Sequence, residues 1–182
     1  EFRRVLFLSL AGVRIELPSN QPIVLLRETG SDRYLPIWIG QPEAASIAMA
    51  VQGVAPQRPM THDLIRDLLQ EVGVTVANVA ITELRDGTYY ETIAMRRNDS
   101  EYEVSSRPSD AIALAVRLGC KILASSEVLE EASVVMTDAE GEDAEAEAAP
   151  PDPAVAEAEV ERVREFLQDI DRKSTRLKSS HT

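Results

Sequence analysis

Two short segments of the chain combine an arginine, a hydroxyl group and an aspartate in an order that suits phosphate chemistry. They read RPMTHD at residues 58–63 and RPSD at residues 107–110. An Arg-Pro pair followed by a hydroxyl side chain and an aspartate is typical of the first turn of a helix. Backbone N–H groups at a helix N-terminus favour anions, and the planar guanidinium of arginine matches phosphate. We expect one phosphate-binding pocket if the segments converge; the alternative is two ordinary helix N-termini.

One histidine and two aspartates in these segments are the candidate catalytic residues. Carboxylates are preferred ligands of divalent ions such as Mg²⁺ or Mn²⁺, and such an ion activates water and stabilises phosphoryl charge. We therefore predict that Asp110 and Asp63 hold a metal ion or orient water, and that His62 assists proton transfer. The remaining carboxylates that could serve as metal ligands are Glu43, Asp67 and Glu83. The alternative for each acid is a side chain that only faces solvent or a helix dipole.

Three arginines and a serine are the candidate phosphate-binding residues. Arg33, Arg58 and Arg107 each lie beside an expected turn or helix N-terminus, from which a guanidinium can reach a phosphate. Ser109 is expected to cap the helix that it begins, by accepting a hydrogen bond from a free backbone N–H of the first turn. Thr61 is expected to cap the preceding helix in the same way.

The sequence lacks the residues and motifs that several other kinds of functional site require. Cys120 is the single cysteine, which excludes an internal disulfide and favours a reducing, cytoplasmic location. His62 and His181 are the two histidines, and because the second lies in the terminal tail, a two-histidine acid–base mechanism is not expected. The P-loop, G-x-G-x-x-G and G-x-S-x-G motifs do not occur. No apolar run approaches the roughly 18 residues that span a bilayer, so we expect no membrane association.

The pattern of apolar residues predicts an α+β fold, with a single compact domain over residues 1–136 and a mixed or antiparallel sheet packed by helices. Strands are expected at residues 5–17, 22–28, 33–39, 74–84, 88–97 and 101–106, and a further short strand leads into a helical turn after Cys120. Helices are expected after Gly40, over residues 61–71, and over the segment that ends at Gly119. Asp86-Gly87 favours a type I′ hairpin turn.

The C-terminal quarter of the chain has a different composition. Residues 137–158 are acidic and of low complexity, and we predict a disordered linker. Residues 159–171 space apolar side chains on one face, which predicts an amphipathic helix able to dock on this chain or on a protein partner. Residues 172–182 form a basic tail, and one interpretation is that this tail is foreign to the natural protein. The net charge of −12 is therefore mostly a property of the C-terminal region.

Three long segments carry a family resemblance. PIVLLRETGSDRYLPIWIGQPEAASIAMA, RPMTHDLIRDLL and RPSDAIALAVR resemble, in order and in spacing, the motifs of the bifunctional nuclease (BFN, DUF151) family. The resemblance covers roughly residues 10 to 130 and implies a compact, usually self-associating α+β domain, with nuclease activity on RNA and DNA in some members. Ser105 stands where many members of the family have an aspartate.

These observations together predict a cytoplasmic, homo-oligomeric nuclease (DNase and RNase) that cleaves phosphodiester bonds of nucleic acid with the help of a divalent metal. The alternative is a non-catalytic module on the same fold, in which the same helix N-termini bind an anionic ligand or a regulatory partner. A weaker alternative makes the C-terminal helix an adaptor for a protein partner.

Overall fold

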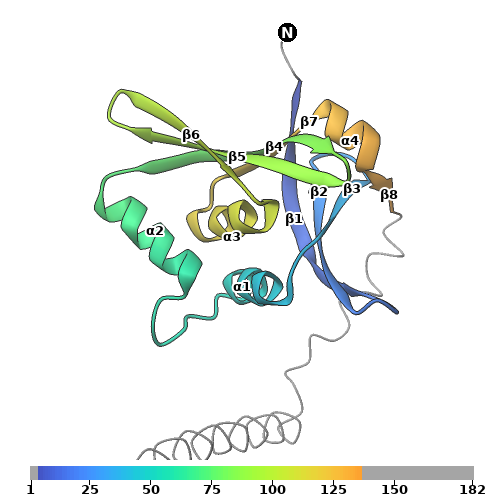
Figure 1. Ribbon diagram of the computed structural model, residues 1–182, viewed down its shortest axis with the longest axis horizontal. Helices are drawn as coiled ribbons and strands as arrows, with labels where there is room; N and C mark the ends of the chain where they lie inside the picture. The colour runs from blue at the N-terminus through green and yellow to red at the C-terminus, as the bar shows by residue number, and fades with distance from the viewer. Residues whose placement is uncertain (1–3, 137–182) are drawn as a thin grey trace, which may run out of the picture. The chain divides into compact units, whose positions relative to one another are not determined.

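The computed structural model describes residues 4–136, which form an α+β fold of one sheet and four helices (Figure 1). The strands are β1 (Val5–Glu16), β2 (Gln21–Glu28), β3 (Arg33–Trp38), β4 (Thr75–Arg85), β5 (Thr88–Arg97), β6 (Ser100–Ser106), β7 (Lys121–Ser125) and β8 (Val134–Val135). The helices are α1 (Gln41–Val51), α2 (Thr61–Glu71), α3 (Pro108–Leu118) and α4 (Ser126–Ala132). The predicted fold class is confirmed.

The sheet has eight strands in the order β6-β5-β4-β7-β1-β2-β3-β8. Neighbouring strands are antiparallel except β4 and β7, which pair in parallel and are connected through β5, β6 and α3. Long crossover connections of this kind are what parallel pairing requires. The sheet is therefore mixed, and α3 lies in its crossover connection, where its N-terminus follows directly on β6.

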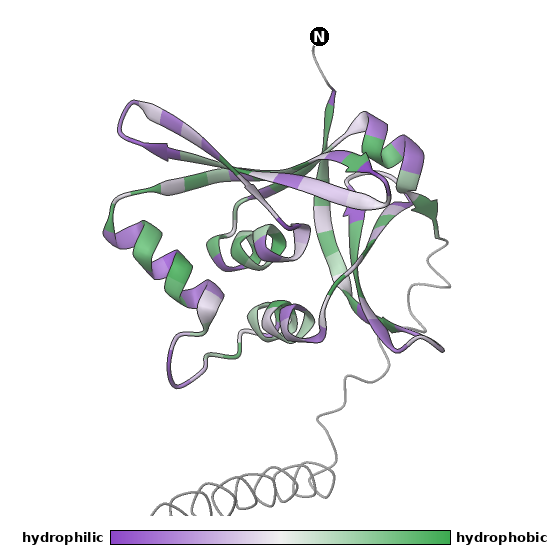
Figure 2. Ribbon diagram, viewed as in Figure 1, coloured by the Kyte–Doolittle hydropathy of each residue, from purple (hydrophilic) through white to green (hydrophobic). Residues whose placement is uncertain are grey.

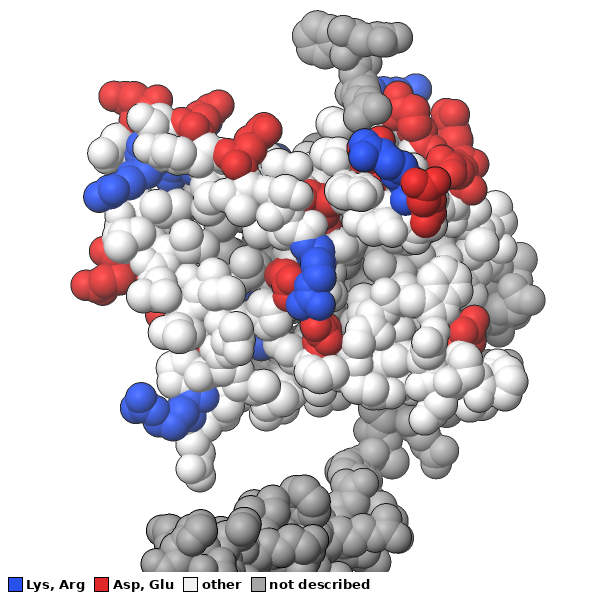
Figure 3. Space-filling view, in the orientation of Figure 1, with Lys and Arg blue, Asp and Glu red and all other residues white. Residues whose placement is uncertain are grey.

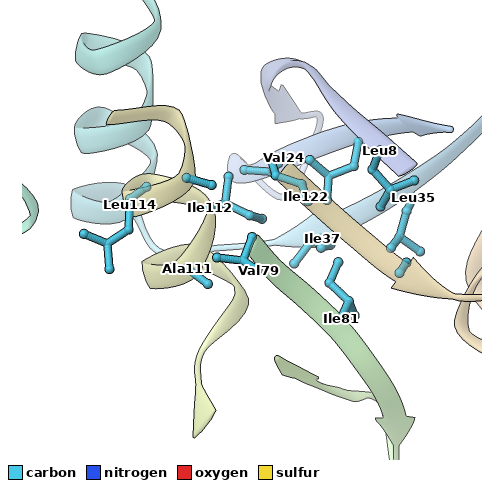
Figure 4. Packing of buried hydrophobic residues seen from close by; sticks show 14 of the residues in the cluster. Leu8, Val24, Leu35, Ile37, Val79, Ile81, Ala111, Ile112, Leu114 and Ile122 are labelled. Carbon is cyan, nitrogen blue, oxygen red and sulfur yellow. The ribbon is translucent and has the colours of Figure 1, made fainter. Parts of the chain in front are cut away.

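The helices α1, α2 and α3 gather on one side of the sheet, whereas α4 packs against β3, β4 and β7 (Figure 1). The central helix is α3, whose residues Ala111 and Ile112 are fully buried against the sheet. Figure 4 shows Ile112 beside Val24, Val79 and Ile122, which come from three different strands. Because α3 packs against the sheet and also against α1 and α2, its N-terminus has a fixed position relative to those two helices.

The two predicted helix caps are wrong, although the helices themselves are confirmed. The N-cap of α3 is Arg107 and that of α2 is Met60, so Ser109 and Thr61 lie inside the first turn. The physical reason is that Pro108 suits the first helical position, which starts the helix before Ser109. In α2, Asp63 replaces a cap because its Oδ2 accepts a hydrogen bond from the backbone N–H of Met60 at 3.1 Å.

The two turns predicted from the sequence, at Asp86-Gly87 and at Gly119, are confirmed. Asp86 and Gly87 have φ angles of 50° and 73°, as a type I′ turn between β4 and β5 requires. Gly119 ends α3 in the left-handed conformation, with a φ of 65°. Positions with positive φ favour glycine, asparagine and aspartate, so these two turns could be located from sequence.

The apolar residues of α2 divide between the core and the surface. Ile65 and Leu69 pack against the core, whereas the side chains of Leu64 and Leu68 remain about half exposed. Figure 2 shows the resulting alternation of hydrophobic and hydrophilic residues along α2.

The predicted linker at 137–158, helix at 159–171 and tail at 172–182 lie outside the described residues. Within residues 4–136, no helix is long and apolar enough to cross a membrane.

Candidate phosphate-binding site

The N-termini of α1, α2 and α3 meet at one pocket of about 590 Å³, which we call the three-helix pocket. Each of the three helices contributes polar residues from its first turn to the lining: Glu43 from α1, Thr61 and His62 from α2, and Arg107 and Asp110 at the start of α3. The remaining lining is largely apolar and comes from α1, α2, α3, β5 and β6. The predicted convergence of the segments 58–63 and 107–110 is thus present in the fold.

Three helix N-termini directed at one cavity produce a local preference for negative charge. Each helix also carries an acid at its third position: Glu43, Asp63 and Asp110. Two of these acids, Glu43 and Asp110, line the three-helix pocket, and the third does not. The three equivalent positions therefore have different surroundings and different roles.

Arg107 links the two carboxylates of the pocket. Its Nε and Nη2 donate to the two oxygens of Asp110 at 2.9 and 3.1 Å, and Nη2 also lies 3.0 Å from Oε1 of Glu43. The side chain of Arg107 is 66% exposed, so the guanidinium remains accessible to solvent and to a ligand. The side chain of Arg107 makes no capping hydrogen bond at the N-terminus of α3. It is instead the exposed cation of the three-helix pocket.

Asp110 is a shared acceptor. Burial acts to raise its pKa, but the hydrogen bonds from Arg107 and His62 outweigh burial and hold the pKa below its ordinary value. The carboxylate is therefore ionised at neutral pH. Its Oδ1 receives both Nη2 of Arg107 at 3.1 Å and Nε2 of His62 at 3.2 Å.

His62 is buried, and each of its ring nitrogens has a partner. An ionised carboxylate only accepts hydrogen bonds, so Nε2 carries the hydrogen and donates to Asp110. Nδ1 makes a hydrogen bond with the hydroxyl of Ser46, which lies 3.0 Å away. Ser46 and Asp110 thus fix the orientation of the imidazole at the wall of the pocket.

Asp63 is held by Arg117. Nε of Arg117 donates to Oδ1 of Asp63 at 2.7 Å, and only 5% of the Arg117 side chain is exposed. This hydrogen bond, with that from the backbone of Met60, lowers the pKa of Asp63 despite its burial. Nη2 of Arg117 also donates to Oγ of Ser46 at 3.1 Å. Asp63 therefore lies next to the site but faces a buried guanidinium and not the three-helix pocket.

A continuous chain of polar contacts results, and it runs Glu43, Arg107, Asp110, His62, Ser46, Arg117, Asp63. Ser46 and Arg117 were missed by the sequence analysis. Arg117 carried a signal, since it is the one charged residue among the aliphatic residues of α3 that follow Asp110. Ser46, in an alanine-rich helix, carried none.

The other predicted residues lie apart from this chain. Arg33 makes a two-bond ion pair with Glu28 at 2.7 and 3.0 Å. Arg58 is exposed in the segment between α1 and α2, and Ser109 is buried in the first turn of α3. The acids Asp67 and Glu83 pair with Arg66 and Arg85.

The site offers two carboxylates to a metal ion, which is fewer than an all-protein binding site requires. Among residues 4–136, no group of three or more histidine, cysteine, aspartate or glutamate side chains is arranged to share one ion. Glu43 and Asp110 nevertheless both contact one cation, the guanidinium of Arg107. A Mg²⁺ ion commonly takes only one or two protein carboxylates and completes its shell with water and phosphate. The donor set fits that mode and not an all-protein cage.

Comparison with known sequences identifies the family to which the chain belongs. The profile of the bifunctional nuclease domain matches residues 24–137, which include every segment that lines the three-helix pocket. The chain belongs to the bifunctional nuclease domain family. The resemblance predicted from the three sequence segments is thereby confirmed.

The relatives include both named nucleases and a protein without an assigned activity. An uncharacterized protein of Mycobacterium tuberculosis is 47% identical over 161 residues, which cover 88% of this chain and 92% of the relative. Bifunctional nuclease 1 of Oryza sativa subsp. japonica is 32% identical over 106 residues, or 57% of this chain and 31% of the rice protein. Bifunctional nuclease 2 of Arabidopsis thaliana is 30% identical over 112 residues, or 58% and 33% of the two chains.

Proposed function

We propose that this protein is a nuclease that hydrolyses phosphodiester bonds of RNA, DNA or both in the three-helix pocket. The observation that carries the proposal is the exposed guanidinium of Arg107, held by Glu43 and Asp110 where three helix N-termini meet. Arginine at such a position matches the charge and the geometry of a phosphate. The family relationship and the names of the plant relatives support the same class of reaction.

Electrostatics favour a small, local site for phosphate over a long binding track. Figure 3 shows Lys and Arg side chains scattered over the viewed face, most of them next to acidic side chains. Affinity for nucleic acid then depends on a few contacts at the pocket and is expected to weaken with salt. Arg107 is the principal contact, and the exposed Arg58 is a candidate for a second one outside the pocket.

The roles of the pocket residues follow from their present partners. A phosphate that binds Arg107 competes with Glu43 and Asp110 for the guanidinium and thereby frees carboxylate oxygens. His62 keeps Asp110 in place through the hydrogen bond from Nε2, and we propose that it assists proton transfer indirectly, by orienting the carboxylate that accepts the proton. We propose that the freed Asp110 orients the attacking water and accepts its proton as the new P–O bond forms, while the P–O bond to the leaving oxygen breaks and that oxygen takes a proton from solvent.

A divalent metal is part of the proposal. Glu43 and Asp110 would hold a Mg²⁺ or Mn²⁺ ion, which would stabilise charge on the phosphate and activate water. Asp63 is not needed as a ligand in this arrangement, because Arg117 already holds it. Its proposed contribution is to position His62 through Arg117 and Ser46.

A second candidate function is binding without catalysis. Both ring nitrogens of His62 and both carboxylate oxygens of Asp110 already have partners within the chain. A fully paired network of this kind also suits a rigid anion-binding module. The test of the nuclease proposal must therefore separate binding from turnover.

The first prediction concerns turnover. The purified full chain is incubated with labelled single- and double-stranded RNA and DNA, with Mg²⁺ or Mn²⁺ and with EDTA. We expect metal-dependent cleavage, reduced about 100-fold or more by Arg107→Ala and by Asp110→Asn, because each removes a group that acts at the phosphate. The matched control is Arg96→Ala, which removes an exposed guanidinium that pairs with Glu101 outside the pocket.

The variants also exclude host contamination, since a contaminant would be equally active in all preparations. Equal activity of wild type, Arg107→Ala and Asp110→Asn would contradict the proposed site. Binding of oligonucleotides by the wild type with no cleavage under any metal condition would favour the binding module.

We also propose self-association through one face of the domain. Leu64 and Leu68 of α2 and Tyr102 and Val104 of β6 are about half exposed, and both α2 and β6 contribute residues to the lining of the three-helix pocket. Among the described strands, β6 is at one edge of the sheet, where its outer backbone groups are available for pairing. A second copy of the chain would cover both features.

A cytoplasmic location remains a proposal that rests on the single thiol of Cys120.

A further inference from the structure

A second pocket, of about 430 Å³, adjoins the three-helix pocket and shares Arg107 with it. It lies between the end of β3, the start of β5 and the first turn of α3, and we call it the Trp38 pocket. Its lining contains Trp38, Tyr89, Arg107, Pro108 and Ser109. Its volume is within the range of small-molecule sites, and nothing in the proposed hydrolysis makes use of it.

The indole of Trp38 is presented to solvent in a fixed orientation. Its only polar atom, Nε1, donates to Oε2 of Glu16 at 3.2 Å, and the residue is 50% exposed. Oε2 of Glu16 also accepts from Ser19 at 2.7 Å, which ties the carboxylate to the neighbouring turn. An aromatic ring that is fixed by a hydrogen bond at its edge, and is partly exposed to solvent, suits stacking against a flat ligand.

Tyr89 closes the pocket on the β5 side. Its hydroxyl donates to the backbone carbonyl of Pro36 at 3.2 Å, so β5 and β3 are connected across the pocket although they are not neighbours in the sheet. Burial raises the pKa of Tyr89, and the phenol therefore stays protonated as this donor. The two aromatic walls are consequently fixed relative to each other.

Arg107 stands between the two pockets. On one side it contacts Asp110 and Glu43 in the three-helix pocket, and on the other it lines the Trp38 pocket. A ligand with an anionic group at Arg107 and a flat aromatic group next to it would occupy both sites at once. A nucleotide has this chemistry, with a phosphate and a base joined through a sugar.

We propose that the Trp38 pocket binds a nucleobase of the substrate, stacked on Trp38, while the adjoining phosphate is held by Arg107. The inference rests on the proposed function for the identity of the ligand, a nucleic acid. It adds a base-binding subsite and a preference for single-stranded or unpaired nucleotides, because a base within a duplex is not free to stack on protein.

Trp38 is the only tryptophan of the chain, so its fluorescence reports on this pocket alone. The full chain is titrated in EDTA with nucleoside monophosphates and short single-stranded oligonucleotides, and with ribose 5-phosphate as the matched ligand without a base. We expect saturable quenching by the ligands that carry a base and none by ribose 5-phosphate. Arg107→Ala should retain quenching at saturation but require a higher ligand concentration.

Variants test the contribution of stacking to affinity. We expect Trp38→Ala to weaken binding of a labelled single-stranded oligonucleotide about 10-fold in fluorescence polarisation, and Trp38→Phe to retain most of the affinity. The control variant is Tyr90→Ala, which removes a partly exposed aromatic ring outside both pockets. Circular dichroism of each variant checks that the fold is kept.

The outcomes separate this inference from the proposed nuclease activity. Quenching without hydrolysis under any metal condition would leave the base subsite standing and remove the nuclease proposal. Hydrolysis that is lost in Arg107→Ala, together with no quenching by any nucleotide, would overturn the subsite and leave the nuclease proposal. Equal quenching by ribose 5-phosphate would also overturn it, because the signal would then report phosphate and not a base.

Discussion

At the scale of single residues, position along a helix did not decide what an acid does. Glu43, Asp63 and Asp110 occupy the same third position of three helices, yet Asp63 faces the buried Arg117 and the other two face the exposed Arg107. The exposure of the arginine makes the difference, because an exposed guanidinium can release its carboxylate partners and bind a ligand, whereas a buried guanidinium cannot. We therefore assign Asp63 to the support of the site.

Asp63→Asn should destabilise the domain strongly. The substitution removes the charge that compensates Arg117, whose side chain is only 5% exposed, and a buried unpaired charge costs about 3–5 kcal/mol. Urea unfolding of the variant measures the loss, and Asp67→Asn is the control because Asp67 pairs with Arg66 at the surface and should change stability by about 1 kcal/mol or less. An Asp63→Asn variant with wild-type stability and no activity would instead place Asp63 in the chemistry.

At the scale of elements, the pairing of β5 with β6 contains a buried acid. Glu91 of β5 is 1% exposed and lies opposite Ser106 of β6, the last residue before the N-cap of α3. Within residues 4–136, neither the Glu91 carboxyl oxygens nor Oγ of Ser106 has a hydrogen-bond partner. Burial raises the pKa of Glu91 well above its ordinary value. The folded protein therefore keeps this carboxyl protonated at pH values where the unfolded chain has ionised it.

This shift predicts a pH dependence of stability. A raised pKa in the folded state means that the stability linked to Glu91 is fully present below the ordinary pKa of 4.5 and is lost as the pH rises towards the folded pKa. We expect Glu91→Gln to lack this decline, so that its stability relative to wild type increases by up to about 1.4 kcal/mol per pH unit above 4.5.

Urea unfolding between pH 5 and 8 measures this difference. Glu101→Gln, at a carboxyl that is 75% exposed, provides the control and should follow the wild-type profile. Parallel profiles for wild type and Glu91→Gln would show that the carboxyl finds a compensating charge when it ionises.

At the scale of the whole molecule, the face that carries α2 and β6 combines the pocket with exposed apolar surface. Met60, Leu64 and Leu68 of this face are between 38% and 55% exposed. Exposed apolar residues grouped on one face commonly mark contacts between subunits. Assembly through this face would place a second copy near the opening of the three-helix pocket.

Leu68→Glu should therefore lower the oligomeric state. A charge at the centre of an apolar contact is costly to bury, so we expect a shift to a smaller species by light scattering coupled to size-exclusion chromatography. Leu17→Glu is the matched control, since Leu17 is 82% exposed in the turn between β1 and β2. A wild-type chain that is monomeric at all concentrations tested would overturn the proposed interface.

Local sequence was sufficient for the α+β class, the main strands and helices, and the turns at Asp86-Gly87 and Gly119, because these depend on periodicity and on backbone preferences of neighbouring residues. It also identified both segments that form the polar site. Tertiary structure decided which of their residues face each other. His62 meets Asp110 because α2 and α3 pack at a particular angle, Asp63 turns to Arg117, and Ser46 joins them from a third helix. Such contacts depend on the packing of distant elements, which no local pattern encodes.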